Sequence, residues 1–599
     1  MRSPARVLNS LTKHNQTTEY RFERLYRILF NEEMYYLAYQ RIYAKPGNMT
    51  QGADGKTIDR MSLSRIEKLI ASLKDESYSP QPSRRVHIPK KNGKTRPLGV
   101  PTFDDKLVQE VVRMVLEAIY EGHFEDTSHG FRPHRSCHTA LNAVQKTFTG
   151  KKWFIEGDIK GFFDNVNHDI LIDILKERIS DERFIRLIRK FLRAGYLEQW
   201  RFHGTYSGMP QGGIISPVLA NIYLDKLDKY MKEYASKFDK GDRGRQQREY
   251  EVLTYQKRLV MRELKTATND AERKVLVNRL KEIDKARSAM PCFAPMDGNF
   301  KRLKYVRYAD DFLIGIIVSK VKIKDDIKRF LADRLALELS DEKTLVTHTE
   351  KPAKFLGYEV TVRKSNLQKR NKRGSLSRVY GNKVRLKVTT EVIKKKLLEL
   401  GVLKFSYHNG HEQWIPKHRS ELINNDDLEI LDSYNAEIRG FYNYYSIANN
   451  ASELNTFHYI MQYSMYKTFA GKYRTTVRRI CQKYKRNGVF TVGYTVKNGQ
   501  VKERRLYNEG FKRKRPSYDR SIDRCPNPMP GVSTTSLIDR LKAQKCELCG
   551  ATDNLVMHHV RKLGELKGKE NWEKLMIARR RKTMAVCGSC HQKIHHGAF

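Results

Sequence analysis

The sequence predicts a multidomain α+β protein, and three observations support that prediction. The chain has 599 residues, roughly four times the length of a typical domain, so we expect three to five structural units. Strand-like segments bounded by turns occupy 84–100, 152–158 and 304–318, whereas helical spacing of apolar residues precedes and follows them. The cysteine-bearing segment at the C-terminus, 536–599, is too short for a large core and is predicted as a small metal-stapled module.

Charge and composition exclude several classes of protein. The 114 Lys and Arg residues against 68 Asp and Glu give a net charge of +46, which favours a phosphate-bearing polymer over a small metabolite as partner. A hydrophobic content of 39% is enough for real cores and excludes a wholly disordered basic protein. The sequence contains no apolar stretch of about 18 residues and no secretory signal, so we expect no membrane partner.

The N-terminal part of the chain predicts helices followed by a hairpin. Residues 18–45 and 62–75 carry apolar residues at helical spacing, which indicates an N-terminal helical layer. From Arg84 the sequence R-R-V-H-I-P-K-K-N-G-K-T-R-P-L-G-V-P alternates apolar and polar residues and turns at Asn92-Gly93. This pattern predicts a β-hairpin with basic residues at its tip.

The central part predicts further strands and a helical insertion. We expect an amphipathic helix over 104–121, a short buried strand over 152–158, and a strand pair around a polar turn over 304–318. Residues 245–290 contain no Gly or Pro and alternate charges with Leu and Val. We therefore expect a solvated helical insertion there, broken near residues 266–269.

The character of the chain changes after about residue 361. Residues 361–385 and 472–486 are rich in Lys and Arg and contain no acid, and apolar spacing over 427–484 indicates a separate α-helical unit. Its tyrosines are assigned to core packing in preference to base stacking. A Pro- and Gly-rich stretch, 526–531, separates this region from the cysteine-bearing end.

Three carboxylates stand at the ends or turns of the predicted strands: Asp158, Asp310 and Asp311. Such a cluster suits two divalent ions about 4 Å apart, which activate a 3′ hydroxyl and stabilise a leaving pyrophosphate. Because successive strand residues face opposite ways, Asp310 is the stronger candidate ligand unless the turn re-aims Asp311. The alternative is that the Asp-Asp pair only caps an exposed turn.

Three neighbouring features favour nucleotide chemistry over a simple turn cap. Phe163 follows Asp158 closely and is placed to close off the sugar 2′ position of a nucleotide. The loop S-G-M-P-Q-G-G at 207–213 has few large side chains, so its backbone can come close to a substrate, and Gln211 is its polar side chain for recognising that substrate. The hairpin tip offers four donors that suit a triphosphate: Lys90, Lys91, Lys94 and Arg96.

The order of the motifs resembles one family. The hairpin with K-T-R-P-L-G is followed by F-R-P-H-R-S from Phe131, then D-I-K-G-F-F-D, P-Q-G-G-I-I-S-P, Y-A-D-D and F-L-G-Y from Phe355. Together these motifs resemble the reverse transcriptases encoded by mobile group II introns, and the similarity runs through essentially the whole chain.

The resemblance implies an RNA-directed DNA polymerase of right-hand shape, with fingers, palm and an α-helical thumb that doubles as a maturase surface. In that family the residues matching Asp158, Asp310 and Asp311 bind Mg²⁺. Phe163 matches a steric gate, and Lys90 and Arg96 match residues that hold the phosphates of a dNTP. Lys343, in S-D-E-K-T, resembles a lysine near the pyrophosphate, and an ordinary surface lysine is the alternative.

The C-terminal segment carries metal-ligand spacing. The pairs C-E-L-C and C-G-S-C supply four thiolates in two knuckles, which predicts a structural Zn²⁺ site rather than disulfides: Cys546, Cys549, Cys587 and Cys590. Interleaved with them are His558 and His559, followed by His591 and His595, which are four residues apart and would face one side of a helix.

This second pattern resembles HNH nucleases of ββα type, which present one divalent ion and a general base to a phosphodiester. By the resemblance, His559 is the base, and His558, His591 and His595 approach the metal. The chain departs from the pattern where an asparagine is expected, because Lys582 or Thr583 stands there, and the third ligand stays open. The alternative is a zinc module that only binds DNA.

The predicted domains follow from the resemblance and the composition. They are an N-terminal helical extension, 1–80; reverse transcriptase fingers and palm, 81–360, with the insertion 245–290; a thumb or maturase domain, 361–485; a basic DNA-binding region and linker, 486–535; and an HNH endonuclease with a four-cysteine zinc site, 536–599.

The hypothesis that joins these parts is a multifunctional retroelement protein. It would bind group II intron RNA and assist its splicing, nick a double-stranded DNA target, and copy RNA from the freed 3′ end. Two rivals stay open: a non-enzymatic splicing factor on a polymerase scaffold, and a retron or diversity-generating reverse transcriptase. A homodimer on the RNA is also left open. A bacterial cytoplasmic, nucleoid-associated location is favoured over an organelle because no transit signal is convincing.

Overall fold

The structure is a computed structural model. It describes residues 3–15, 17, 19–43, 47–89, 95–199, 201–209, 212–294, 297–317, 321–363, 365, 367–370, 374, 376–378, 382–495, 500–519, 537–579 and 581–597. The predicted Asn92-Gly93 turn, Lys90, Gln211 and the stretch 526–531 lie outside these residues. None of the helices in the described ranges has both the length and the apolar character that crossing a membrane requires.

The N-terminal layer, residues 3–80, is helical. Its elements are α1 (Pro4–Thr12), the 3-10 helix η1 (Tyr26–Phe30), α2 (Glu32–Ile42) and α3 (Leu63–Lys74). The prediction over 62–75 matches α3, whereas the region 18–45 divides into η1 and α2. The division falls at Asn31, which is extended and caps α2 by accepting a hydrogen bond from the N–H of Glu33.

The basic hairpin forms as predicted. β1 (Ser83–Pro89) pairs antiparallel with β2 (Thr95–Val100), and β1 also pairs in parallel with β4 (Tyr196–Glu198). β5 (Arg201–His203) completes a sheet of order β2-β1-β4-β5. The helix expected over 104–121 is α4 (Phe103–Tyr120), which is buried nearly all round rather than along one face because it runs through the largest core.

The central sheet holds both predicted strand segments. Its order is β6-β7-β3-β8, with β6 (Arg302–Tyr308), β7 (Asp311–Ile317), β3 (Trp153–Asp158) and β8 (Leu345–His348), all antiparallel. Alternate residues enter different cores: Ile155 and Ile314 pack toward the N-terminal layer, whereas Phe154 and Leu313 pack toward the C-terminal helices. Both faces are therefore buried, which explains the nearly continuous apolar runs.

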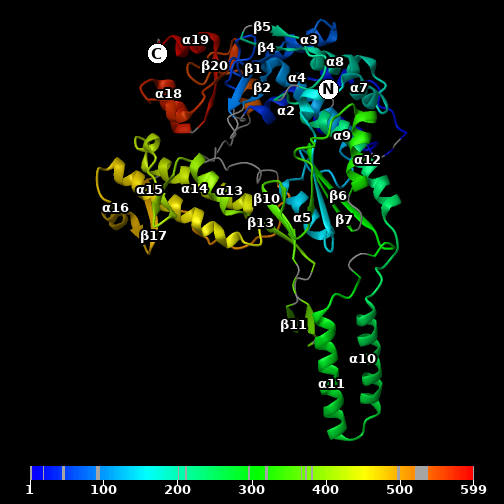
Figure 1. Cartoon of the computed structure of the whole chain (residues 1–599). Coiled ribbons are helices and arrows are strands. Elements are labelled where there is room, and N and C mark those ends of the chain that lie inside the picture. Colours follow the sequence, from blue (N-terminus) through cyan, green and yellow to red (C-terminus); the bar gives the residue numbers. More distant parts are fainter. Residues whose placement is uncertain are drawn as a thin grey trace.

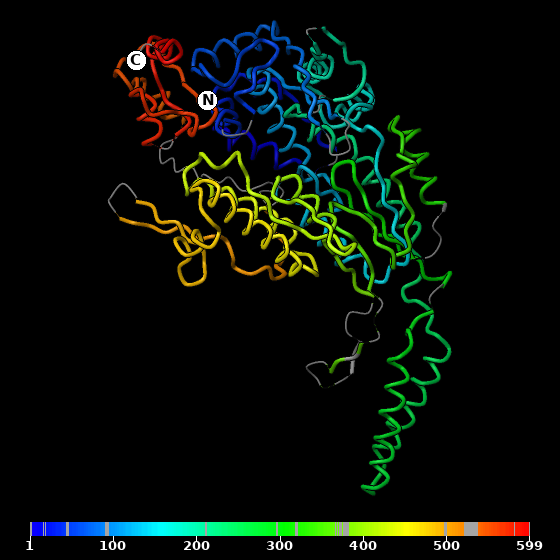
Figure 2. Tube along the Cα trace, turned by 60° about the vertical axis from the view of Figure 1, so that its left-hand side comes forward, coloured from blue at the N-terminus to red at the C-terminus, as the bar shows by residue number. Residues whose placement is uncertain are grey.

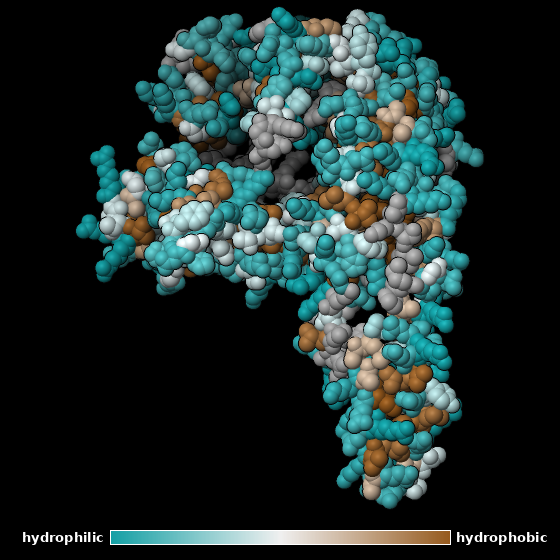
Figure 3. All heavy atoms as spheres, in the orientation of Figure 1, coloured by the Kyte–Doolittle hydropathy of each residue, from teal (hydrophilic) through white to brown (hydrophobic). Residues whose placement is uncertain are grey.

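Some helices of this region lie beside the sheet and others lie nearer the N-terminal layer (Figure 1). They are α5 (Cys137–Thr147), α6 (Phe162–Asn165), α7 (His168–Lys176), α8 (Glu182–Arg193), α9 (Ser216–Phe238) and α12 (Val321–Leu335). The predicted insertion forms the helical hairpin α10 (Arg248–Thr266) and α11 (Asp270–Ala289), which projects away from the body. Its helices meet through Val260, Leu276 and Ile283, and hydrophobic residues also gather on its surface (Figure 3).

The C-terminal helical unit begins with a small sheet. β9 (Ala353–Phe355), β10 (Tyr358–Val362) and β13 (Val384–Lys387) pair side by side, and β10 runs through residue 360, where the sequence places a boundary. Its helices are α13 (Thr390–Glu399), α14 (Asp427–Tyr445), α15 (Leu454–Lys472) and α16 (Val477–Tyr484). Tyr442 and Tyr445 are buried, so their assignment to core packing is confirmed.

Shorter strands complete this unit: β14 (Leu403–His408), β15 (His411–Pro416), β16 (Lys485–Arg486), β17 (Val489–Thr495) and β18 (Val501–Arg505). β11 (Gln368–Arg370) and β12 (Leu376–Arg378) pair with each other and lie beside α11 instead (Figure 1). Phe490, Leu506 and Phe511 of the predicted DNA-binding region enter the same core as α14 and α15. The described start of that region thus packs on the helical unit.

The cysteine module, residues 537–597, is a ββα arrangement, as the sequence predicts. β19 (Leu555–His559) pairs antiparallel with β20 (Thr583–Cys587), which leads into α19 (Gly588–His596); α17 (Leu537–Lys542) and α18 (Asn571–Arg579) complete it. Figures 1 and 2 both show the module beside the N-terminal layer. Leu541 and Met557 are buried in the same core as the residues of α2.

Candidate active sites

Three carboxylates meet at one end of the central sheet. Asp158 ends β3, Asp311 begins β7, and the two are cross-strand partners. Asp310 occupies the turn between β6 and β7, directly after Ala309, whose φ of 57° is left-handed. Burial first, and then the charge of Asp158, raises the pKa of both Asp310 and Asp311, which places the three carboxylates near one another. The structure therefore brings the three predicted carboxylates together.

The turn that carries Asp310 is held from both sides. Arg307, which is fully buried, donates to Asp228 Oδ1 at 2.8 Å, to Ser128 Oγ at 2.7 Å and to the carbonyl of Ala309 at 2.9 Å. On the other side lies Gly130, where a Cβ would collide with the backbone nitrogen of Ala309. This arrangement fixes the turn, and the F-R-P-H-R-S motif lies against it.

The electrostatics of the cluster favour a cation. Desolvation, followed by the charges of Asp310 and Asp158, raises the pKa of Asp311 to about 7, although part of Asp311 is exposed. Desolvation, and then the charge of Asp158, also raises the pKa of Asp310. A divalent ion would relieve this repulsion, and carboxylate oxygens are the ligands that Mg²⁺ prefers, so the residues fit such an ion.

Lys343 is part of this site. Its ammonium donates to Asp158 Oδ2 at 2.7 Å while most of its side chain stays exposed. The hydrogen bond to Asp158 raises the pKa of Lys343. A tight turn positions the lysine, because the N–H of Thr344 donates to the carbonyl of Ser340 at 2.8 Å. The structure thus places Lys343 beside Asp158, and its role near the pyrophosphate stays a prediction.

The segment carrying Phe163 packs on the glycine-rich loop. The N–H of Met209 donates to the carbonyl of Phe163 at 2.6 Å, and the N–H of Gly208 donates to the carbonyl of Val166 at 2.7 Å. Phe163 is half-buried, and its ring meets that of Phe162 at 5.2 Å. The loop and the aromatic side chain thus form one unit next to Asp158.

Of the contacts predicted for the hairpin tip and the glycine-rich loop, Arg96 and not Lys90 or Gln211 is among the described residues. Desolvation raises the pKa of Asp310 and the positive charge of Arg96 opposes that rise, which indicates that the guanidinium lies near the carboxylates. Arg96 is on β2, so the basic hairpin reaches over this end of the central sheet. Lys90 and Gln211 are outside the described residues.

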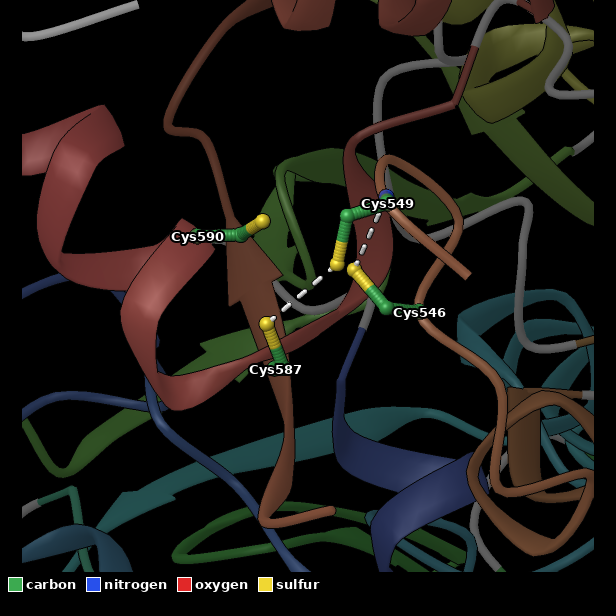
Figure 4. A group of neighbouring side chains, drawn as sticks. All are labelled: Cys546, Cys549, Cys587 and Cys590. Atoms are coloured by element: carbon green, nitrogen blue, oxygen red, sulfur yellow. Dashed lines mark hydrogen bonds between the residues drawn. The ribbon is translucent and has the colours of Figure 1, made fainter. Parts of the chain in front are cut away.

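Four cysteine sulfurs converge in the cysteine module (Figure 4). All four Sγ atoms lie within 4.8 Å of one another, and those of Cys549 and Cys587 are 3.6 Å apart. Cys587 ends β20 and Cys590 lies in α19, whereas Cys546 and Cys549 precede β19. A compact set of four thiolates is the ligand set of structural zinc, so a four-cysteine site of zinc type is present.

A second cluster contains three predicted histidines and one residue that the sequence analysis missed. The ligand atoms of His558, His591, His595 and Asp59 all lie within 4.8 Å of one another. Asp59 comes from the loop before α3, and its Oδ2 is 3.0 Å from His591 Nε2 and 2.9 Å from His595 Nε2.

His559, the predicted general base, points away from this cluster. Its ring nitrogen Nε2 lies 2.7 Å from the hydroxyl of Tyr39. Its backbone N–H donates a hydrogen bond to Asp59 Oδ1 at 2.8 Å. His559 is buried, and desolvation lowers its pKa to about 3. The imidazole does not face solvent in this arrangement, so its role as a base stays a prediction.

Lys582 and Thr583, the two candidates for the position of the expected asparagine, lie at the start of β20. Thr583 is the cross-strand partner of His559, and its hydroxyl accepts a hydrogen bond from Arg540 at 2.9 Å. The backbone of Lys582 accepts from the N–H of Val560. Thr583 thus joins a hydrogen bond within the module, while Asp59 supplies the additional acidic group beside the histidines.

Three regions of the chain match known families. Residues 88–255 match "Reverse transcriptase (RNA-dependent DNA polymerase)", residues 382–515 match "Type II intron maturase", and residues 546–591 match "AI2M/AI1M-like, HNH endonuclease". The maturase match includes the β17–β18 hairpin, in agreement with its packing on the helical unit.

Relatives match over nearly the full chain. The group II intron-encoded protein LtrA of Lactococcus lactis subsp. cremoris is 43% identical over all of both chains. The putative COX1/OXI3 intron 1 protein of Saccharomyces cerevisiae is 34% identical, covering 98% of this chain and 71% of its own. Among solved structures, the Sicinivirus 3Dpol RNA dependent RNA polymerase aligns over 67% of this chain and 66% of its own, with a TM-score of 0.35 and 10% identity.

Proposed function

The chain belongs to the group II intron-encoded proteins, and from that premise we propose which of its residues carry each activity. It is a reverse transcriptase and maturase with an HNH endonuclease domain. Domains of these two enzymatic kinds use divalent metals. The assignment of individual residues rests on the geometry of the two candidate active sites.

Asp158, Asp310 and Asp311 hold two Mg²⁺ ions in this proposal. The observation that supports it is the cross-strand pairing of Asp158 with Asp311 beside the turn that carries Asp310. When bound, the ions supply activation of the primer 3′ hydroxyl and charge stabilisation on the pyrophosphate. The carboxylates hold the ions, and the fixed turn keeps their spacing.

Lys343 and Arg96 hold phosphates of the incoming dNTP. Lys343 is 2.7 Å from Asp158 and largely exposed, so its ammonium can turn from the carboxylate to the leaving pyrophosphate. Arg96 lies close enough to Asp310 for its charge to oppose the desolvation that raises the pKa of this carboxyl. Phe163 is the steric gate against a ribose 2′ hydroxyl, and Lys90 and Gln211 complete the proposed dNTP contacts.

The polymerase assignment predicts a loss that is specific to copying. Asp310→Ala removes an ion ligand and is expected to abolish primer extension on an RNA template, measured with a labelled primer. Intron RNA binding and assisted splicing should stay near the level of the unmodified protein. Asp333→Ala, at an exposed aspartate of α12, is the matched control and should extend normally. Extension by Asp310→Ala would contradict the assignment.

In the HNH domain, His558, His591 and His595 hold one divalent ion, and His559 activates water. The four-cysteine site holds a structural Zn²⁺ that fixes β19 and β20 against α19. The domain nicks one strand of the DNA target, and the released 3′ end enters the polymerase site as primer. The ββα arrangement with the three clustered histidines supports this assignment.

The nuclease assignment is tested by replacing His559, the proposed general base. His559→Gln should abolish nicking of a duplex target while primer extension persists, because only the nuclease loses a proton acceptor. Tyr39→Phe removes the hydroxyl that His559 contacts but keeps the imidazole, so this control should still nick. Both activities are followed on labelled DNA, and unchanged nicking by His559→Gln would show that another group is the base.

The partners are the intron RNA and a double-stranded DNA target. The net charge of +46 supports binding to both polyanions, and the maturase match supports the RNA in particular. Because the full-length relative is from Lactococcus lactis, we place the protein in a bacterial cytoplasm, at the nucleoid.

A further inference from the structure

Asp59 belongs to the N-terminal layer, yet its side chain lies among the three clustered histidines of the nuclease domain. We propose that Asp59 is a fourth ligand of the nuclease's divalent ion, supplied by the N-terminal layer, and that its presence closes the nuclease site. The inference rests on the proposed assignment of His558, His591 and His595 to the ion. In the closed arrangement the nuclease domain is latent, and a phosphodiester oxygen of DNA must replace the Asp59 carboxylate.

The first support is the geometry of the carboxylate. Asp59 Oδ2 accepts hydrogen bonds from two imidazoles at once, His591 Nε2 at 3.0 Å and His595 Nε2 at 2.9 Å. Its other oxygen lies 3.6 Å from His558 Nδ1. Without an ion, the imidazole protons bridge these groups. A divalent ion would take the place of those protons, since all four residues offer a ligand atom within 4.8 Å.

An independent observation points to a ligand. His558 is only 3% exposed, and neither of its ring nitrogens makes a hydrogen bond within the described part of the chain. Burying a polar ring without a partner is unfavourable, and such groups commonly mark the place of an ion or water. The ring nitrogen lies in the same 4.8 Å cluster, so an ion there would satisfy it.

Four protein ligands make this site different from an open catalytic one. Catalytic sites of this kind keep a position for water or substrate, whereas closed sets of four ligands are typical of structural ions. The base is engaged as well, because His559 Nε2 contacts the hydroxyl of Tyr39 at 2.7 Å. Both the ion site and the base thus contact the N-terminal layer, and nicking requires the nuclease domain to leave it.

The interface around Asp59 is continuous rather than a single contact. The N–H of Met557 donates to the carbonyl of Met61 at 2.8 Å, and that of His559 donates to Asp59 Oδ1. Lys542 Nζ lies 3.0 Å from Glu33 Oε1. Met557 is fully buried in a core shared with α2. The N-terminal layer therefore adds an antiparallel contact to the outer side of β19, next to the cluster.

Exchange of one anionic oxygen for another explains how DNA opens the site. A phosphodiester and a carboxylate both present a negatively charged oxygen to a cation. His595 is the exposed member of the cluster, so a phosphate reaches the ion from that side. A phosphate that displaced Asp59 from a bound ion would remove the contact between the ion and the N-terminal layer, and the departure of the nuclease domain from that layer would separate His559 from Tyr39.

The proposal is tested on the full-length protein with its four-cysteine site loaded with zinc. Cobalt(II) is titrated in, and its visible absorption reports four-coordinate binding with nitrogen ligands, whereas carboxylate-only sites absorb weakly. Asp59→Asn keeps the oxygen that accepts from the N–H of His559, yet it should weaken cobalt binding at least about tenfold. Asp54→Asn, in the same loop but exposed, is the matched control and should bind as the unmodified protein does.

Hydrogen exchange gives a second readout that needs no activity. The amides of Met557 and His559 point to the N-terminal layer and should be protected in the cobalt-loaded protein. Protection should fall in Asp59→Asn and on adding a short DNA duplex to the unmodified protein. If Asp59→Asn leaves both cobalt affinity and protection unchanged, the proposal is overturned; persistent protection with bound duplex overturns the displacement step.

A third variant separates this inference from the nuclease assignment. His558→Ala removes a ligand that both proposals share and should also weaken cobalt binding at least about tenfold. If His558→Ala weakens cobalt binding and Asp59→Asn does not, only the role of Asp59 fails. If neither variant weakens it, the ion site itself is wrongly assigned.

Discussion

At the scale of single residues, the proposed polymerase site would couple proton binding at Asp311 to metal binding. Desolvation and the neighbouring carboxylates raise the pKa of Asp311 from the ordinary value of 3.8 to about 7. The folded protein therefore holds this proton more tightly than the unfolded chain, so ionisation of Asp311 lowers the free energy of unfolding as pH rises through that interval. A metal ion needs the ionised form and competes with the proton.

This competition predicts a pH-dependent need for metal. Raising the pH from about 6 to about 8 should lower the Mg²⁺ concentration that gives half-maximal primer extension, since Asp311 is then ionised before the ion arrives. The measurement is a Mg²⁺ titration of primer extension at several pH values. Asp333→Asn, at an exposed aspartate, should show the same dependence as the unmodified protein. A half-maximal concentration that does not change across this range would contradict the prediction.

At the scale of elements, the turn between β6 and β7 depends on a loop far away in sequence. A side chain would not fit at position 130, because the backbone nitrogen of Ala309 occupies the space that a Cβ would take. Backbone atoms cannot give way as a flexible side chain does, so any larger residue must displace the turn that carries Asp310. A small displacement of a metal ligand is costly in rate.

Gly130→Ala is therefore expected to lower the rate of primer extension at least about tenfold. DNA nicking by the nuclease domain should be unaffected, because its residues lie elsewhere. Gly298→Ala is the matched control, since nothing lies within 4 Å of a Cβ at that position. Both rates are measured on the same protein preparations. Normal extension by Gly130→Ala would show that the turn tolerates movement.

Elements with a strong local pattern could be predicted from the sequence, and long-range burial could not. The hairpin β1–β2 and the strands β3, β6 and β7 follow from alternation and turn residues. α4 reads as amphipathic but is buried nearly all round, because elements from distant parts of the chain cover it. The periodicity of a helix's own sequence does not show which distant segments pack against that helix.

The candidate sites divide in the same way. Residues within motifs, such as Asp158 and the paired cysteines, were identifiable because spacing alone suggests their chemistry. Asp59 and Tyr39 were not, since they meet His559 across about 500 residues of sequence and belong to no metal-binding spacing. Lys343 is an intermediate case. Its motif suggests a place near the polymerase site, but the contact with Asp158 could be seen only in the structure.

At the scale of the whole molecule, the two faces of the central sheet join the parts of the protein. One face packs toward the N-terminal layer, on which the nuclease domain lies, and the other packs toward the maturase region. The polymerase site at the end of this sheet is thus fixed between the regions proposed to bind RNA and to cut DNA. The net charge of +46 acts across all of them.

That charge predicts steeply salt-dependent binding to nucleic acid, to which individual lysines contribute. Lys502, exposed on β18 in the predicted DNA-binding region, is expected to neutralise one phosphate. Lys502→Ala should therefore reduce the slope of log K against log salt for a DNA duplex by about one, whatever its sequence. Fluorescence anisotropy over a salt series measures the slope. Lys232→Ala is the control, because Lys232 already pairs with Glu125, and this variant should keep the slope of the unmodified protein. An unchanged slope in Lys502→Ala would place the DNA on another surface.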